Sequence, residues 1–406
     1  MSWETIRLGD IADFSNGINF DKSAYANGVL LIGVSNFGNK FYPDYFKLAQ
    51  VKEDVVRQSD YLQDGDIVFV RSNGNKELVG RCMLIKEPPF PVTYSGFCIK
   101  ARLKDTSSYD PTFFTYHFKN IGFRRAMSGT AVGANIQNLS QARLSNYEAR
   151  IPDIKTQRRI ADILSTYDAL IKNNQKQIGL LEEAAQRLYK EWFVDLRFPG
   201  YENIPVVDEL PEGWKVLCIS DVCDTIGGGT PSTKVKEYYQ GGDILWVTPT
   251  DITRNNSLIL LDTGAKITKE GLENSSAKML PAETILMTSR ASVGFFGICE
   301  HEVCTNQGFI SCIPYKGIVQ MYLLYNLMNR VDEIRGKAGG STYLEISKKV
   351  FREFKIVVPD DSTLNRFQCI IYTYIQRMRV LAKAIAQLQQ ACDRLLPKLM
   401  NGEVEV

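Results

Sequence analysis

The chain has 406 residues, of which 44% are hydrophobic and 23% are charged. These proportions are typical of a folded globular protein and exclude a wholly disordered chain, while the length predicts two to three domains. Lysine and arginine total 48, aspartate and glutamate total 46, and the net charge is +2. A strongly basic nucleic-acid-binding coat is therefore excluded, so any DNA-binding surface must be a local concentration of charge.

Neither the cysteines nor the histidines are spaced as a metal site requires. The nine cysteines include no CxxC pair, and the two histidines, His117 and His301, lie far apart in the sequence. Zinc sites need closer clusters, so we expect no metal site and interpret the cysteines as reduced, mostly buried thiols. The first residues carry no secretory signal and no apolar run is long enough to span a bilayer, which predicts a cytoplasmic protein without a membrane segment.

An internal duplication with a period of about two hundred residues organises the chain, and a period this long duplicates a domain rather than a small solenoid unit. Pro152 and Pro359 close the two copies. Three pairs of segments carry the repeat: 3–11 and 214–222, 62–69 and 280–287, and 95–97 and 307–309.

Each copy combines a mixed domain with a long helical segment. Residues 1–152 and 201–358 contain short apolar, β-branched runs between glycine and asparagine turns, together with a few helices such as 111–125 and 319–335. Residues 153–200 and 359–406 contain long stretches in which glycine and proline are rare. The predicted fold class is α+β: two mixed α/β domains separated by two long helices, related by a pseudo-twofold internal repeat.

Apolar residues recur along both helical segments with alternating steps of four and three. This 3.5-residue repeat, sustained over several heptads, predicts a coiled-coil seam, and at 1.5 Å per residue each seam spans about 50 Å. The predicted seam residues are Ile160, Leu164, Tyr167, Ile171, Asn174, Ile178, Leu181, Ala185, Leu188 and Trp192 in the first helix, and Phe367, Ile371, Tyr374, Met378, Leu381, Ile385, Leu388, Cys392, Leu395 and Leu399 in the second.

The two seams match in length and phase, so each helix is the expected partner of the other. The repeat alone is compatible with parallel or antiparallel pairing. Asn174 stands where the other copy has Leu381. It is interpreted either as a buried amide that fixes the register or as a residue at the edge of the seam.

Catalytic motifs are not found in the context that their chemistry needs. The segment 86–90 is similar to the [Asn/Asp/Ser]-Pro-Pro-[Tyr/Phe] motif of amino-methyltransferases, but it begins Lys86-Glu87 and no glycine-rich cofactor turn accompanies it. The triple glycine 227–229 leads into Thr230-Pro231, which opens a turn and not a phosphate-binding helix. We therefore expect a non-catalytic protein. The alternatives are a stand-alone DNA adenine methyltransferase and a coiled-coil adaptor that binds only proteins.

Three helical segments, 151–164, 168–171 and 188–200, resemble the conserved central region of the specificity (S) subunits of type I restriction–modification enzymes (the HsdS family). The run Tyr189-Lys190-Glu191-Trp192-Phe193 is the most specific part. The resemblance extends over the whole chain as target-recognition domain 1 (1–152), conserved helical spacer 1 (153–200), target-recognition domain 2 (201–358) and conserved helical spacer 2 (359–406). The second spacer departs from the family's glutamine-led start, because it begins Thr363-Leu364-Asn365.

The resemblance implies an antiparallel coiled coil and a function in DNA recognition. A specificity subunit reads a bipartite, asymmetric site in double-stranded DNA and positions separate methyltransferase (M) subunits and, where present, restriction (R) subunits. It also implies that S-adenosylmethionine, ATP and Mg belong to those partner subunits, so no cofactor is expected in this chain. A rod of about 50 Å exceeds one 34 Å turn of duplex, which predicts half-sites more than about ten base pairs apart.

Two loops in each mixed domain are candidates for DNA contact. One follows the shared strand, and the other is a small polar loop that precedes each long helix. Arginine can fork onto guanine and asparagine onto adenine, whereas serine and lysine suit phosphate. The candidate DNA-binding residues are Arg71, Ser72, Asn73, Asn75, Lys76, Arg124, Arg125, Asn135 and Gln137 in the first domain, and Lys234, Ser289, Arg290, Arg335, Ser341, Thr342 and Tyr343 in the second.

Each candidate has a simpler interpretation. The first loop can also be interpreted as a solvated turn with an arginine salt bridge, the second as a flexible connector, and Lys234 as part of a solvated charged turn. Because the two domains share a frame and differ in their loops, we expect the two half-sites to differ in sequence.

Overall fold

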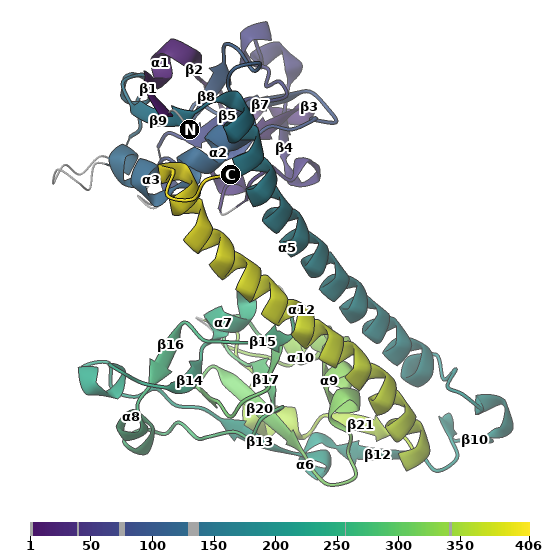
Figure 1. Ribbon diagram of the computed structural model, residues 1–406. Coiled ribbons are helices and arrows are strands. Elements are labelled where there is room, and N and C mark those ends of the chain that lie inside the picture. The colour runs from purple at the N-terminus through teal and green to yellow at the C-terminus, as the bar shows by residue number, and fades with distance from the viewer. Residues whose placement is uncertain (1–2, 39, 73–77, 129–137, 256, 341–342) are drawn as a thin grey trace. The chain divides into compact units, whose positions relative to one another are not determined.

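A computed structural model describes residues 3–38, 40–72, 78–128, 138–255, 257–340 and 343–406 (Figure 1). The chain divides into two compact units. The first unit comprises Met1–Ala169 with Leu388–Val406, and the second comprises Leu170–Gln387. Each unit therefore contains one mixed α/β domain together with parts of both long helices, and each is described by itself below.

The described residues of the first unit form three small sheets. Strands β1 and β9 pair antiparallel, a four-stranded antiparallel sheet has the order β2-β8-β5-β6, and a third sheet has the order β4-β3-β7 with β3 and β7 parallel. Strand bounds are β1 Trp3–Arg7, β2 Ala12–Asn16, β3 Tyr25–Ile32, β4 Ala49–Val51, β5 Ile67–Val70, β6 Cys82–Leu84, β7 Val92–Tyr94, β8 Cys98–Leu103 and β9 Glu148–Pro152. Helix bounds are α1 Leu8–Ile11, α2 Pro111–Lys119, α3 Ile121–Ser128 and α4 Gln141–Ser145.

The second unit repeats this design. Strands β12 and β21 pair antiparallel, the large sheet has the order β13-β20-β17-β18-β15, the third sheet has the order β16-β14-β19, and β10 and β11 form a separate hairpin. Strand bounds are β10 Val206–Val207, β11 Leu210–Pro211, β12 Lys215–Cys218, β13 Cys223–Gly227, β14 Ile244–Val247, β15 Ile259–Leu260, β16 Ala265–Ile267, β17 Ile285–Thr288, β18 Phe296–Cys299, β19 Cys304–Thr305, β20 Phe309–Pro314 and β21 Lys355–Val358. Helix bounds are α6 Ile219–Val222, α7 Pro249–Thr253, α8 Lys269–Glu273, α9 Gln320–Asn329, α10 Val331–Gly336 and α11 Lys348–Arg352.

The matching strand orders confirm the predicted duplication, with one correction of register. Phe69 lies opposite Ile99, and its counterpart Met287 lies opposite Ile310. Phe309 therefore corresponds to Cys98, not to Phe97 as the repeated Gly-Phe pair predicts. A shift of one residue moves a side chain to the other face of a strand. Accordingly, Phe97 is 64% exposed and Phe309 only 2%.

The helices predicted at 111–125 and 319–335 are each divided in two. The first is interrupted at Asn120, whose backbone is not helical and whose side-chain oxygen accepts a hydrogen bond from Gly122 N at 3.0 Å. Asparagine competes for backbone donors in this way, which favours the end of one helix and the start of another. The second is interrupted at Arg330, between α9 and α10.

Two long helices, α5 (Ile154–Tyr189, continued by a π-helical turn at Lys190–Val194) and α12 (Asp361–Asn401), carry the predicted seams. Aspartate caps the start of each. Asp153 accepts a hydrogen bond from Thr156 N, and Asp360 accepts one from Thr363 N, both at 3.0 Å. Such caps satisfy backbone donors that the helix itself cannot pair.

The contacts within each unit show that the helices pair antiparallel. In the first unit Leu164, early in α5, shares a core with Leu399, late in α12. In the second unit the rings of Trp192, in the π-helical turn that continues α5, and Phe367, early in α12, lie 5.9 Å apart. All predicted seam residues are buried or partly buried, including Asn174, which is partly buried. The coiled coil predicted from the 3.5-residue repeat is therefore confirmed.

Helix α12 also buries a second face that the seam pattern does not contain. Leu364, Ile375, Arg379 and Ala382 are buried, and the apolar members belong to the same core as α9. These positions lie beside the seam on the helix surface. The apolar stripe of α12 is therefore wider than a pure coiled-coil seam, because the helix packs on its own domain as well as on α5.

Candidate nucleic-acid interface

In each unit the two candidate loops are joined to each other by backbone hydrogen bonds. In the first unit Ser72 forms an antiparallel bridge with Asn138, and Leu139 N donates to Arg71 O at 2.8 Å. In the second unit Arg290 forms the same bridge with Glu345, and Ile346 N donates to Ser289 O at 3.0 Å. The loop after the shared strand and the loop before the long helix therefore form one site in each unit.

The first site is centred on Arg71, which is partly buried. Its Nη1 donates to Gly96 O at 3.1 Å, and its backbone N donates to Phe97 O at 2.8 Å. Ser72 is partly buried and Asn138 is exposed beside it. The predicted residues Asn73, Asn75, Lys76, Asn135 and Gln137 lie outside the described residues.

Two further candidates of the first unit lie on α3. Arg124 is partly buried and Arg125 is exposed. Since α3 ends directly before the second loop, both residues are within the segment that leads into the first site.

The second site presents an ion pair at its surface. Arg290 Nε lies 3.6 Å from Glu345 Oε2, and the two side chains are 47% and 48% exposed. Ala291, at φ 61°, donates from its backbone N to Leu344 O at 2.8 Å, and Tyr343 is exposed next to it. The arginine therefore has the salt bridge that the simpler interpretation of this loop expects, in a position open to solvent.

The other candidates of the second unit have different surroundings. Arg335 Nε donates to Val293 O at 2.9 Å, and its guanidinium lies 5.7 Å from the centre of the Phe295 ring, so it braces the loop after β17. Ser289 is buried and Lys234 is exposed in the segment after β13. Ser341 and Thr342 lie outside the described residues.

Asn138 and Glu345 complete the two sites. Sequence reasoning placed Asn138 in the candidate loop without naming it as a DNA-binding residue, and it missed Glu345. The repeat contains a signal for both, because they stand at equivalent positions before the two long helices. A comparison of the two loops shows that this position holds an amide in the first copy and a carboxylate in the second.

The triple glycine before Thr230 serves close packing. A Cβ atom added to Gly228 would lie 2.1 Å from Thr305 O, and one added to Gly229 would lie 2.2 Å from Ser276 Oγ. Gly229 O also accepts a hydrogen bond from Trp246 Nε1 at 3.0 Å. Glycine is needed here because the backbone approaches its neighbours more closely than any side chain allows.

Burial favours the neutral forms of Cys82, Cys98 and His117. Burial raises the pKa of Cys82 to about 11 and that of Cys98 to about 12, and lowers the pKa of His117 to about 4. All nine cysteines are free. Among the described residues, no group of three or more His, Cys, Asp or Glu side chains could hold a metal ion. Nor does this part of the chain contain a helix with the length and apolar composition of a membrane span.

The model of the type I restriction modification DNA specificity domain matches residues 1–183 and again residues 211–390. The chain belongs to this family. The two matches correspond to the two copies of the internal repeat, each consisting of a mixed domain and most of its long helix.

Relatives in the family are specificity subunits. The HindI specificity subunit of Haemophilus influenzae is 25% identical over 99% of this chain and 99% of its own length. The MjaIX specificity subunit of Methanocaldococcus jannaschii is 35% identical over 41% of this chain and 38% of its own length. The crystal structure of a type I S subunit from M. genitalium has a TM-score of 0.58 at 16% identity and covers 98% of this chain and 96% of that one. The last comparison confirms the fold class.

Proposed function

We propose that the chain is the DNA sequence-recognition subunit of a type I restriction–modification complex, that it reads a bipartite, asymmetric site in double-stranded DNA, and that it has no active site of its own. The observation that carries this proposal is the pair of equivalent sites, one in each unit, where Ser72 meets Asn138 and Arg290 meets Glu345. Membership of the specificity family supports it.

The two sites offer different chemistry to DNA. Asparagine pairs with the edge of adenine, arginine forks onto guanine, and glutamate accepts from the amino group of cytosine. The exposed Arg290–Glu345 ion pair contributes at most about 1 kcal/mol, whereas a bidentate contact to the correct base contributes about 1–3 kcal/mol. Exchanging the intramolecular pair for base contacts is therefore favourable. Since the two sites differ, the half-sites they read differ as well.

Partner subunits supply the chemistry in this proposal. The long helices carry exposed apolar residues, Leu170 and Leu180 on α5 and Tyr372 and Val380 on α12. These side chains leave apolar surface on the helices available for contact with another protein. We infer that methyltransferase subunits and, in a complete system, restriction subunits dock on the helices. S-adenosylmethionine, ATP and Mg would then be bound by those subunits and not by this chain.

Two measurements separate this function from its alternatives. Binding of the full chain to duplex DNA over a range of salt concentrations should weaken linearly in log salt, as phosphate contacts require. An adaptor that binds only proteins has no duplex affinity at all. In the second measurement, the chain alone is titrated with S-adenosylmethionine. We expect no saturable binding, and saturable binding would favour a stand-alone methyltransferase.

A further inference from the structure

Two carboxylates stand at the base of the hairpin that carries the second site, which is the second reading site of the proposed function. The hairpin consists of β17 and β18, and its tip is the loop at 289–295 that contains Arg290. Glu283 precedes β17 and Glu300 follows β18. The backbone N of Glu283 donates to Cys299 O at 2.8 Å, which places the two glutamates side by side.

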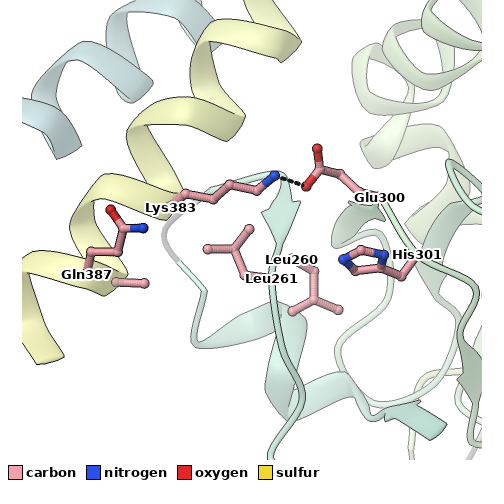
Figure 2. Close-up of a pocket in the computed structure, with 7 residues that line it drawn as sticks. Leu260, Leu261, Glu300, His301, Lys383 and Gln387 are labelled. Carbon is pink, nitrogen blue, oxygen red and sulfur yellow. Dashed lines mark ion pairs between the residues drawn. The ribbon is translucent and has the colours of Figure 1, made fainter.

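Helix α12 reaches these carboxylates with two cations that lie one helical turn apart. Arg379 contacts both carboxylate oxygens of Glu283 through Nη2, and its Nε lies 3.8 Å from Glu300 Oε1. Lys383 Nζ lies 2.6 Å from Glu300 Oε2, beside a pocket of about 290 Å³ that His301 also lines (Figure 2). The carboxylates at the base of both hairpin strands are thus paired with cations on one face of α12.

The Arg379 side chain is buried at this junction, with only 5% of its surface exposed. A buried guanidinium is tolerated only when it is paired, and the planar fork of arginine suits a carboxylate better than the point charge of lysine does. Without Arg379, Glu283 and Glu300 would be neighbouring carboxylates in a site where their side chains are only 29% and 22% exposed, and only Glu300 would keep a cation, Lys383. The ion pairs therefore determine where the hairpin base lies against the helix.

The backbone at Glu283 supports a specific role for this carboxylate. Glu283 has φ 69°, and its counterpart in the first unit is Gly65, with φ 86°. Glycine adopts this left-handed conformation without steric cost, whereas glutamate does not. The backbone is therefore strained at the glutamate of the second unit and unstrained at the glycine of the first. The contact between Glu283 and Arg379 offsets the free-energy cost of this strain.

We propose that Arg379 is a positioning residue for the second reading site: it fixes the β17–β18 hairpin on α12 so that the loop containing Arg290 meets its half-site in one orientation. This inference rests on the proposed function. Strands β17 and β18 have four residues each and pair with each other, so a tilt at the base of the hairpin displaces its tip. Base recognition depends on contacts that tolerate only small displacements.

The first unit holds the equivalent strand by different means. Arg102 on β8 contacts Asp66, directly before β5, through Nη2 at 2.6 Å and through Nε at 2.7 Å. This pair lies within the sheet itself and involves no side chain of a long helix. Loss of Arg379 should therefore affect one half-site and leave the other unchanged.

The test uses the full chain and a duplex selected from a random pool by the wild-type protein. The half-site read by the second unit is the one whose recognition is lost in Arg290→Ala. In Arg379→Met, the preference for the selected sequence over single-base-pair changes in that half-site should fall by about tenfold, the discrimination that one base pair carries. Discrimination in the other half-site should not change. Lys269→Met is the matched control, because it removes only an exposed ion pair with Glu273 on α8 of the same unit and should change discrimination by less than about twofold.

Two further variants separate positioning from mere stability. Arg379→Lys keeps the charge without the fork and should retain the fold with an intermediate loss of discrimination. Arg379→Met combined with Glu283→Gln removes both charges, so the melting temperature should recover while discrimination stays low. Recovery of discrimination together with melting temperature, or an unchanged preference in Arg379→Met, would overturn the proposal. Absence of any sequence-specific duplex binding by the wild type would instead overturn the proposed function.

Discussion

The hydroxyl of Tyr116 on α2 donates a hydrogen bond to Asp168 Oδ2 on α5, at 2.6 Å. The second unit has a bond of the same kind, because Asn326 Nδ2 on α9 donates to the hydroxyl of Tyr189 on α5 at 2.8 Å. In both units, therefore, the first helix after the large sheet is joined to α5 by a buried or partly buried polar contact. Such contacts fix the orientation of a domain on the helix more specifically than apolar packing does.

Removing the first of these bonds should destabilise the first unit. Tyr116→Phe leaves a carboxylate in a partly buried site without its donor, and a hydrogen bond to a charged group contributes about 2 kcal/mol. We expect a loss of this size in the free energy of unfolding, measured with chemical denaturant. Tyr25→Phe, at an exposed tyrosine, is the control and should change the stability by less than about 0.5 kcal/mol. An equal effect of both variants would argue against the role of Asp168.

Stability should fall in mild acid because of His117. Burial among the rings of Phe114, Phe123 and Tyr147 lowers its pKa from about 6.5 to about 4. Between these values the unfolded chain binds a proton that the folded chain excludes, so the stabilisation present above pH 6.5 is lost as the pH falls towards 4. The slope is at most about 1.4 kcal/mol per pH unit.

His117→Leu removes the group and should flatten the pH dependence in this window. The measurement is denaturant unfolding at a series of pH values. His301 is exposed, so His301→Gln is the control and should keep the slope of the wild type. A slope that persists in His117→Leu would assign it to other groups.

Shortening a leucine of α5 to alanine should lower the free energy of unfolding, and the loss should be larger the more deeply that leucine is buried. Leu164 on α5 is fully buried and shares a core with residues at the end of α12, whereas Leu180, also on α5, is exposed. Leu164→Ala should cost about 2–5 kcal/mol of unfolding free energy, because it leaves a cavity. Leu180→Ala should cost less than about 0.5 kcal/mol. Similar losses in both variants would contradict the placement of the seam.

The two reading sites should act on separate half-sites. Arg290→Ala removes a guanidinium that the structure presents at the surface, and it should weaken binding to one half-site by about 1–3 kcal/mol. Arg71→Ala should affect the other half-site. Titration of duplexes altered in one half-site at a time measures this directly. Equal losses on both half-sites, or none, would refute the assignment.

The sequence predicted features that depend on periodicity and repetition. The seam from Ile160 to Trp192 and its copy in α12 follow from a 3.5-residue pattern, which is local in the chain. The duplicated strands follow from matched segments, although the match of Phe97 with Phe309 was wrong by one residue, because a Gly-Phe pair carries no information on which face a strand presents.

Features that depend on contacts between distant segments could not be predicted. Nothing near Arg379 in the sequence indicates that it meets Glu283 and Glu300, since those contacts arise only when β17 and β18 fold against α12. The union of the two candidate loops, Ser72 with Asn138 and Arg290 with Glu345, likewise requires the folded domain. Sequence reasoning found the loops separately, and the backbone bridges show that each pair forms one site.

The most direct test of the central claim is methylation mapping of DNA from cells that contain this chain together with the proposed methyltransferase subunit. Two different reading sites predict a gapped, asymmetric motif whose two parts change separately in Arg71→Ala and Arg290→Ala. A continuous motif, a symmetric motif, or methylation unchanged when the chain is deleted would contradict the account.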